Sequence, residues 1–354
     1  MPTASTVDQA VAGMLRGDGG LWFADGEPPR GWRGDGAVVQ TSGSAGASKR
    51  VVLSRAALVA AAEATAIRLG GAATWHLALP PRYVAGLMVM VRGRLGAGVR
   101  FASPDLSDLD LAPGLNATSV VPTQLYRAVR QPGTASILAR FDAVLVGGAA
   151  LARELRVWAE EWGIRVIETY GMSETCGGVV YDGIPLPGAT VRVAPDERAP
   201  QGHGRVVLGG RTLFDGYLEE PGPTAEVLVD GCLLTGDWGR LEDGRLVLGG
   251  RLDDVVVTGG VNVDVARVRA VAARLDPETD VIAVPDDEWG ARIVLAATAG
   301  DLASWRERLG AELPRPALPR QVLVLPALPR TAGGKPDRAA LRALVRDAAP
   351  PNAK

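Results

Sequence analysis

The stretch "FDAVLVGGAALARELRVWAEEWGIRVIETYG", residues 141–171, decides the fold class. Its first part, 141–148, is a short apolar run that ends in two glycines, which is typical of a buried strand. Residues 152–163 have the length and apolar spacing of a helix, and residues 164–171 return to strand-forming side chains. Because a strand, a helix and a second strand follow one another directly, this stretch predicts a layered α/β core.

The same alternation extends towards the N-terminus and changes further along the chain. We expect helices at 56–70 and 84–98 and strands at 74–80 and 117–122. From about residue 183, short alternating strands with Gly, Pro and Asp turns indicate a β-rich subdomain. Residues 254–354 predict a small α+β part, with strands at 280–286, 292–299 and 322–329 and a helix at 301–313. We therefore expect a large layered N-terminal domain (1–252) and a small C-terminal domain (253–354).

The composition indicates a soluble, cytoplasmic protein. The 354 residues are 47% hydrophobic and 22% charged, enough to bury the cores of two domains. The formal charge of -2 is spread without long single-sign blocks, which argues against a nucleic-acid-binding role. Two cysteines give no disulfide framework or zinc spacing, and we find neither a signal peptide nor a membrane-spanning stretch. Neither of the two histidines has a catalytic motif around it, and we expect His76 to be packed or hydrogen-bonded.

A segment rich in glycine and hydroxyl residues, "TSGSAGASK" (41–49), has the composition of a phosphate-binding loop. It is not a Walker A loop, because Gly46 is separated from Lys49 by two residues. Taken alone, the segment is equally compatible with a mobile Gly/Ser turn.

Five further motifs follow this segment along the chain. They are "VGGAAL" (146–151), "ETYGMSET" (168–175), "LLTGDWG" (233–239), "GRLDDVVVTGGVNV" (250–263) and "LPRTAGGKPDR" (328–338). Together with the 41–49 segment and in this order, they resemble the core motifs of the adenylate-forming superfamily, which contains acyl-CoA synthetases, adenylation domains and luciferases. The resemblance implies an α/β N-terminal domain and a small mobile C-terminal lid.

The resemblance also implies a reaction in two halves that uses ATP, Mg²⁺ and CoA. A carboxylate attacks the α-phosphate of ATP and releases pyrophosphate, and a thiol then displaces AMP from the acyl-adenylate. Because the first half joins two anions, it needs cations and hydrogen-bond donors placed at the developing charge.

The resemblance assigns the phosphates, the metal ion and the nucleotide to particular residues. For the β- and γ-phosphates the residues carried over are Thr41, Ser42, Gly43, Ser44, Gly46 and Lys49. Two positions depart from the family pattern: Ala45 stands where threonine is usual and Ser48 where proline is usual. The residues carried over for the nucleotide are Tyr170, Gly171, Gly148 and Ala149 at the adenine, Ser173 at the α-phosphate, Glu174 at Mg²⁺, and Asp237 and Arg251 at the ribose.

The resemblance also gives roles to residues of the C-terminal lid. Lys335 would bridge the carboxylate and the α-phosphate in the first half-reaction, and Asp253 lies at the family's hinge position. The resemblance implies that the lid then rotates, so that Lys335 leaves and residues 257–263 line the tunnel for the thiol.

The acid substrate is suggested by a narrower resemblance. Only 40 residues precede the phosphate loop, and this short region together with residues 77–98 looks like the short form of the o-succinylbenzoate-CoA ligases of menaquinone biosynthesis. Arg82, Tyr83 and Arg92 are candidates for the acid site, with an arginine facing the carboxylate that does not react. A helix with solvated arginines is the alternative, and in many relatives a histidine stands where Tyr83 does.

Other functions remain open at this point. They are a ligase for another aryl or alkyl acid, a stand-alone adenylation enzyme that loads a separate carrier protein, and a binding or regulatory protein whose site has decayed, for which Ala45 is the argument. We also expect a homodimer, because shortened cores often leave apolar surface to cover.

Overall fold

The computed structural model describes residues 4–30, 32, 34–41, 48–330 and 336–347. The chain forms two compact units that alternate along the sequence. The first contains 1–192, 207–234 and 241–246, and the second contains 193–206, 235–240 and 247–354. The boundary expected between residues 252 and 253 therefore lies within the last segment of the second unit, and it stays a prediction about the part that moves.

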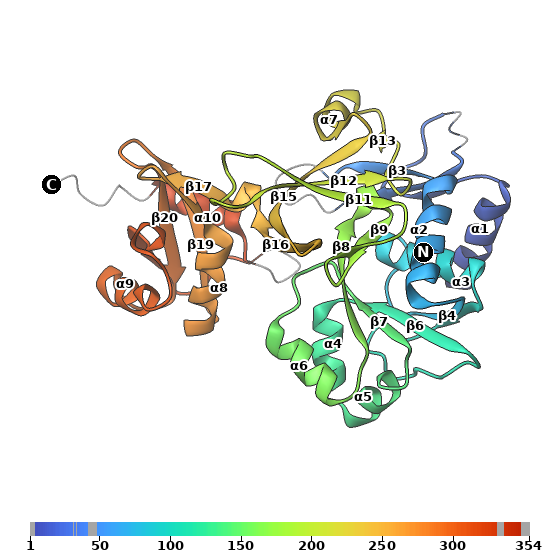
Figure 1. Cartoon of the computed structure of the whole chain (residues 1–354). Coiled ribbons are helices and arrows are strands. Elements are labelled where there is room, and N and C mark those ends of the chain that lie inside the picture. Colours follow the sequence, from blue (N-terminus) through green and yellow to red (C-terminus); the bar gives the residue numbers. More distant parts are fainter. Residues whose placement is uncertain (1–3, 31, 33, 42–47, 331–335, 348–354) are drawn as a thin grey trace. The chain divides into compact units, whose positions relative to one another are not determined.

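The first unit is built on a seven-stranded sheet in the order β10-β9-β8-β7-β6-β4-β5 (Figure 1). Its strands are β4 (Ala73–Leu77), β5 (Gly98–Phe101), β6 (Leu115–Val120), β7 (Ala143–Val146), β8 (Val166–Met172), β9 (Gly177–Tyr181) and β10 (Ile184–Pro185). Neighbours from β5 to β8 are parallel, whereas β9 and β10 add antiparallel pairs at one edge. The predicted α/β core is confirmed, because α6 (Arg153–Glu161) connects the parallel strands β7 and β8.

The other helices of this unit agree with the sequence pattern where one was identified. Outside the β-rich region, they are α1 (Ala4–Arg16), α2 (Arg55–Leu69), α3 (Val84–Leu95), α4 (Pro122–Val129) and α5 (Pro132–Leu138). Helix α2 begins where the Ser54 hydroxyl accepts a hydrogen bond from the backbone of Ala57 (3.3 Å), and it ends at Gly70, whose φ is +83°. Helices α2 and α3 were expected, whereas α1, α4 and α5 were not.

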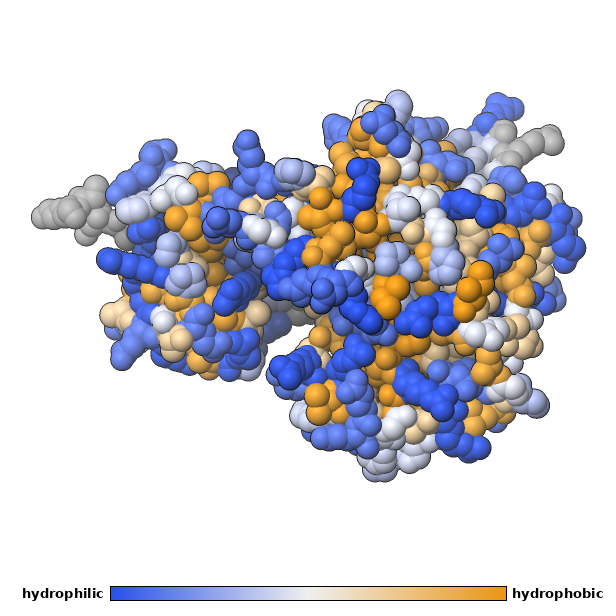
Figure 2. Space-filling view, viewed as in Figure 1, coloured by the Kyte–Doolittle hydropathy of each residue, from blue (hydrophilic) through white to orange (hydrophobic). Residues whose placement is uncertain are grey.

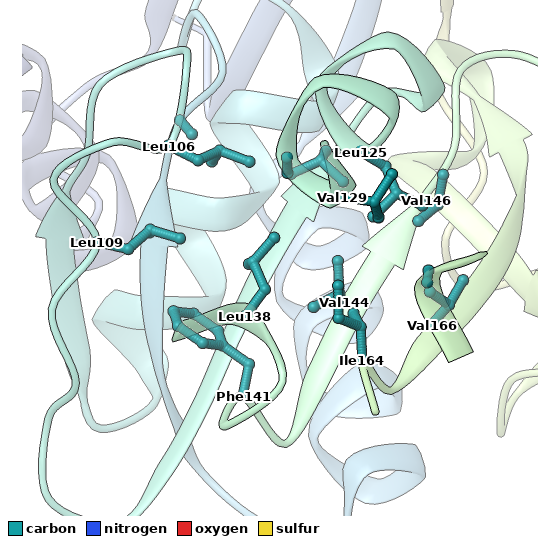
Figure 3. Close-up of a cluster of buried hydrophobic side chains, with 14 of the residues drawn as sticks. Leu106, Leu109, Leu125, Val129, Leu138, Phe141, Val144, Val146, Ile164 and Val166 are labelled. Carbon is teal, nitrogen blue, oxygen red and sulfur yellow. The ribbon is translucent and has the colours of Figure 1, made fainter. Parts of the chain in front are cut away.

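A buried nonpolar cluster fixes one face of the large sheet (Figure 3). Val144 and Val146 of β7 lie among side chains of α4 and α5, including Leu125 and Leu138, and all four are fully buried. The cluster therefore holds the strand ends from which the adenine-side motifs emerge.

A second, four-stranded sheet of the same unit has the order β1-β2-β3-β13. Its strands are β1 (Leu21–Phe23), β2 (Gly36–Gln40), β3 (Arg50–Ser54) and β13 (Gly216–Tyr217). Strands β2 and β3 pair antiparallel on either side of the 41–49 segment, and Tyr217 pairs with Val51. This sheet brings residues 216–217 beside the segment expected to bind phosphate.

The β-rich region expected from residue 183 is present. It contains β11 (Ala189–Ala194), β12 (Gly204–Gly210), β14 (Leu228–Val229), β15 (Cys232–Glu242) and β16 (Arg245–Arg251). The divisions between the two units fall within β11, β12, β15 and β16. The short helix α7 (Pro221–Val227) was not expected in this region.

The second unit contains a three-stranded sheet, a β-hairpin and three helices within the described residues. Its elements are β17 (Val255–Thr258), β18 (Val261–Asp264), α8 (Val265–Leu275), β19 (Thr279–Asp286), β20 (Gly290–Ala297), α9 (Leu302–Gly310), β21 (Gln321–Val324) and α10 (Arg338–Asp347). The strands and the helix expected around residues 280–313 are confirmed. The strand expected at 322–329 is shorter, because Pro326 lacks the N–H that a continuing strand needs.

The surface of the described residues gives no indication of a membrane span. Among their helices, none has the length and apolar character needed to cross a bilayer. On the face seen in Figure 2, hydrophobic areas alternate with hydrophilic side chains.

Candidate active site

The base of the expected phosphate loop is closed by its two end residues. The Thr41 backbone N–H donates to the Lys49 carbonyl oxygen (2.9 Å), and the Lys49 N–H donates to the Thr41 hydroxyl (3.2 Å). These bonds continue the antiparallel pairing of β2 with β3 by one residue on each strand. The predicted residues Ser42, Gly43, Ser44 and Gly46 lie outside the described residues.

The 168–175 motif places a carboxylate at the end of β8. Ser173, Glu174 and Thr175 form a short 3₁₀ turn, and the buried Thr175 hydroxyl donates to the carbonyl oxygen of Gly177 (2.7 Å). The Phe214 N–H donates to the carbonyl oxygen of Glu174 (2.9 Å), so Glu174 is held from two sides. Ser173 and Glu174 are both half-buried, which leaves their side chains partly accessible to a ligand.

Tyr217 contacts both charged side chains of this part of the site, Lys49 and Glu174. Its hydroxyl donates to Glu174 Oε1 (2.8 Å), and the Lys49 ammonium lies 4.3 Å from the centre of its ring. Burial raises the pKa of the Tyr217 hydroxyl and the Glu174 carboxylate raises it further, so the hydroxyl stays protonated and donates. A cation and a carboxylate therefore contact different parts of a single neutral side chain.

The residues expected at the adenine follow neighbouring parallel strands. Gly148 and Ala149 come after β7, Tyr170 lies at the end of β8, and the two strands pair through Val146 and Glu168. Ligands of open α/β sheets bind outside the carboxyl ends of such strands. The structure therefore brings Gly148, Ala149 and Tyr170 to the same edge of the sheet.

Gly171 is required by close packing at this edge. A Cβ at this position would lie 2.0 Å from the Gly177 carbonyl oxygen in β9. The pairing of β8 with β9 is also irregular between Tyr170 and Gly171. A larger residue at 171 would push β9 away and move Tyr170.

The ribose candidates lie in the second unit and contact one another. Arg251 Nη1 is 3.2 Å from Asp237 Oδ1, and its Nη2 is 2.8 Å from Asp253 Oδ2. The Thr235 hydroxyl accepts from the Asp237 N–H (3.1 Å) and donates to the Val206 carbonyl oxygen (2.7 Å). The structure thus joins the ribose candidates to the expected hinge residue, Asp253, which lies in the 3₁₀ turn Leu252–Asp254.

Lys335 lies outside the described residues, and the described residues that flank 331–335 contact one another. Arg330 and Pro336 form an antiparallel bridge, and the Asp337 N–H donates to the Pro329 carbonyl oxygen (2.8 Å). Arg338 Nε is 3.0 Å from Asp280 Oδ2. The two ends of the segment that carries the lysine are therefore held together at their base.

The acid-site candidates differ in their surroundings. Arg82 and Tyr83 are exposed and contact each other, with Arg82 Nη2 donating to the Tyr83 hydroxyl (2.9 Å). Arg92 is only 6% exposed, lies 5.1 Å from the centre of the Trp75 ring, and has an Nε without a hydrogen-bond partner. The interpretation of Arg92 as a solvated helix arginine is wrong, because α3 packs this side chain into the first unit.

Cys176 and His76, to which the sequence analysis gave no catalytic role, are both buried. Burial raises the pKa of the Cys176 thiol, the Asp215 carboxylate raises it further, and the guanidinium of Arg92 opposes both. Cys176 directly follows the 168–175 motif, so a buried thiol borders that segment. His76 is buried and its Nε2 is 3.0 Å from Asn116 Oδ1, which confirms the expected hydrogen-bonded imidazole.

The donor set fits Mg²⁺ that arrives with a nucleotide. Within the described part of the chain, no group of three or more His, Cys, Asp or Glu side chains could hold a metal ion alone. Mg²⁺ is commonly bound by one or two carboxylates together with substrate phosphates. The single, half-buried carboxylate of Glu174 suits this mode of binding.

A family model described as AMP-binding enzyme matches residues 12–218, more than half of the chain. This chain belongs to that family. The family's expected motifs at 41–49, 146–151 and 168–175 all lie within the matched region.

Curated relatives of the family cover most of this chain. It is 39% identical over 327 residues to a probable 2-succinylbenzoate–CoA ligase of Mycobacterium tuberculosis strain H37Rv, covering 86% of this chain and 83% of the relative. It is 32% identical to the 2-succinylbenzoate–CoA ligase of Escherichia coli K12, covering 88% of this chain and 69% of that protein.

Solved structures support the fold. ATP-bound MatB from Rhodopseudomonas palustris matches with a TM-score of 0.72 and 26% identity, covering 88% of this chain and 68% of that chain. The o-succinylbenzoate CoA synthetase MenE of Bacillus subtilis, in complex with the acyl-adenylate OSB-AMP, matches with a TM-score of 0.73 at 22% identity, covering 89% and 70%. The mixed α/β fold is therefore that of adenylate-forming enzymes.

Tyr217 is the site residue that the sequence analysis missed. It lies in the two-residue strand β13, and no local pattern around it points to a ligand. Its place beside Lys49 and Glu174 depends on the pairing of β13 with β3, a contact between distant parts of the chain. Only an expected strand pairing could have revealed it.

Proposed function

We propose that this chain is an ATP-dependent 2-succinylbenzoate–CoA ligase, which converts o-succinylbenzoate to o-succinylbenzoyl-CoA in menaquinone biosynthesis. The observation that carries the proposal is the 39% identity with a probable ligase of this name over 86% of the chain. The arrangement of Lys49, Tyr217 and Glu174 supports the ATP-dependent part of the reaction.

In the first half-reaction, the acid carboxylate would attack the α-phosphate of ATP and pyrophosphate would leave. We assign Thr41 and Lys49 to the β- and γ-phosphates, Ser173 to the α-phosphate and Glu174 to Mg²⁺. Mg²⁺, when bound, supplies positive charge that offsets the developing negative charge on the phosphates. Lys335 would bring a second positive charge between the two reacting anions.

We assign the nucleoside contacts within each unit by itself. We assign Tyr170, with Gly148 and Ala149, to the adenine, because all three lie at the carboxyl edge of the large sheet. We assign Asp237 to the ribose hydroxyls and Arg251 to holding the Asp237 carboxylate in position, which their 3.2 Å contact supports.

Arg92 is the residue that we propose for the carboxylate that does not react. A buried guanidinium whose Nε lacks a partner is costly unless an anion completes its surroundings. Arg82 is exposed and already donates to Tyr83, so it has less to gain from the substrate.

In the second half-reaction, the CoA thiol would attack the acyl-adenylate and AMP would leave. We propose that rotation near Asp253 withdraws Lys335 and brings residues 257–263 to the thiol. The glycines at positions 259 and 260 both have positive φ, +59° and +76°, so this β17–β18 turn needs residues without a side chain.

Pyrophosphate release, measured with ATP, Mg²⁺ and CoA, tests the proposal. The acid panel should contain o-succinylbenzoate, benzoate, salicylate and medium-chain fatty acids, with the thioester detected by mass. We expect a strong signal from o-succinylbenzoate and formation of its CoA thioester. Pyrophosphate without thioester would favour an enzyme that loads a carrier protein, and another acid as best substrate would overturn the substrate assignment.

We also propose a cytoplasmic location and a homodimer. Exposed nonpolar side chains support the homodimer: Tyr126 of α4 and Trp158 of α6 lie with 6.4 Å between their ring centres, and the exposed Trp162 directly follows α6. Light scattering after size exclusion measures the mass directly. A mass of 36.8 kDa would contradict the homodimer.

A further inference from the structure

Tyr217 is held firmly in place beside the expected phosphate loop. It pairs with Val51 in β3, its N–H donates to the Thr224 hydroxyl (2.8 Å), and it is only 8% exposed. Its ring also packs edge-on against Phe214, with 5.1 Å between the ring centres. A side chain fixed in this way can hold its neighbours in a defined position.

The Tyr217 side chain contacts an anion through its hydroxyl and a cation through the face of its ring. The hydroxyl donates to Glu174 Oε1 at 2.8 Å, and the ring attracts the Lys49 ammonium, 4.3 Å from its centre. Within the described residues, no ion pair joins Lys49 directly to Glu174. Tyr217 therefore satisfies both ions without letting them neutralise each other.

This separation matters for a site that binds a metal–nucleotide complex. A lysine paired with Glu174 would compete with Mg²⁺ for the carboxylate and with phosphate for the ammonium. A hydrogen bond from a neutral hydroxyl instead orients a metal-binding carboxylate and leaves its charge in place. The aromatic ring stabilises the ammonium and adds no competing anion.

We infer that Tyr217 is a positioning residue that keeps Lys49 and Glu174 apart and presents each of them separately to Mg²⁺ and ATP. The inference rests on the proposed function and goes beyond it by assigning the metal dependence to a residue outside the six motifs identified in the sequence. A purely structural tyrosine would need only its ring, because Phe214 and the strand pairing contact no hydroxyl.

Tyr217→Phe separates the two roles, because it keeps the ring and removes the hydroxyl. The measurement is equilibrium binding of ATP at increasing Mg²⁺ concentration, by titration calorimetry, with no acid present. We expect the Mg²⁺ concentration for half-maximal binding to rise about tenfold, since loss of a group that orients a metal ligand typically has this effect. ATP affinity without Mg²⁺ should not change, because the ring still holds Lys49.

Tyr181→Phe is a matched control. Tyr181 is fully buried in the same unit, and its hydroxyl lies 3.1 Å from the Thr65 hydroxyl, away from Lys49 and Glu174. This variant also loses a buried hydroxyl, but its Mg²⁺ dependence should equal that of the wild type.

The possible results distinguish this inference from the proposed function. If Tyr217→Phe has the same Mg²⁺ dependence as Tyr181→Phe, Tyr217 is structural and the inference is wrong. If the wild type binds no ATP at any Mg²⁺ concentration, the proposed function itself is wrong. Tyr217→Leu removes the ring as well, and here we expect ATP affinity to fall even without Mg²⁺.

Discussion

Asp280→Asn should destabilise the second unit strongly, because Asp280 is a buried carboxylate between two arginines. It lies at the start of β19 and is 1% exposed. Oδ1 is 2.9 Å from Arg269 Nε, and Oδ2 is 3.0 Å from Arg338 Nε. Asparagine has nearly the same shape, so the change removes charge without leaving a cavity.

The expected loss in the free energy of unfolding follows from the exposure of the two arginine side chains that contact Asp280. Removing one member of a buried ion pair costs about 3–5 kcal/mol, because the remaining charge stays buried without compensation. The Arg269 side chain is 17% exposed and would keep only a longer contact with Asp254 (Nη2 to Oδ1, 3.4 Å), so its charge would be partly compensated. Arg338 is 42% exposed and its share is screened by solvent. We therefore expect a loss of about 3 kcal/mol, near the lower end of the range.

Urea unfolding, followed by hydrogen exchange in peptides from β19 and α8, reports on this unit specifically. A loss of about 3 kcal/mol should lower the unfolding midpoint by about 1–2 M urea. Arg274→Gln is the control, because its ion pair with Glu312 is 59% and 51% exposed and should contribute less than about 0.5 kcal/mol. Equal midpoints for the two variants would refute the argument that burial decides the cost.

Three further predictions concern the reaction and the thiols. Lys335→Ala should reduce ATP–pyrophosphate exchange by at least about 100-fold, while thioester formation from preformed acyl-adenylate is retained; equal loss in both assays would contradict a moving lid. Arg92→Gln should raise the KM for o-succinylbenzoate about tenfold or more and leave the KM for ATP unchanged in steady-state assays; an unchanged KM for the acid would remove Arg92 from the acid site. At about pH 8, iodoacetamide should label the partly exposed Cys232 and spare Cys176, because burial and Asp215 raise the pKa of the Cys176 thiol and keep it protonated; alkylation of native Cys176, detected by peptide mass spectrometry, would contradict its burial.

The sequence was sufficient where local patterns determine structure. Strand β7, helix α6 and strand β8 lie within the stretch 141–171 as expected, because hydrophobic periodicity acts over a few residues. The motifs also predicted residues that the fold brings to one edge of the sheet, since Gly148 follows β7 and Tyr170 lies in the adjacent parallel strand β8.

The features that the sequence analysis missed have either a weak local signal or contacts between distant residues. Helix α8 was missed because its start signal is a single residue, Asp264, whose carboxylate accepts from the backbone of Ala266 (2.8 Å). Arg92 was treated as a possible surface residue, because α3 is buried on all sides at 86–93 and its pattern shows no polar face that would separate Arg92 from the exposed Arg94. Tyr217 could not be placed at all, since its neighbours Lys49 and Glu174 come from other parts of the chain.

The alternation of the two units along the chain limits how this protein can recombine with its relatives. A crossover at the expected hinge would exchange residues 253–354 and leave 193–206 and 235–240 behind, although both segments belong to the second unit. Ala199 and Trp238 of those segments pack with Leu252 and Val255 in one buried cluster. In such a chimera, Val255 from one protein would pack against Ala199, Trp238 and Leu252 of the other. A functional exchange therefore has to include 193–206 and 235–240 or match their packing.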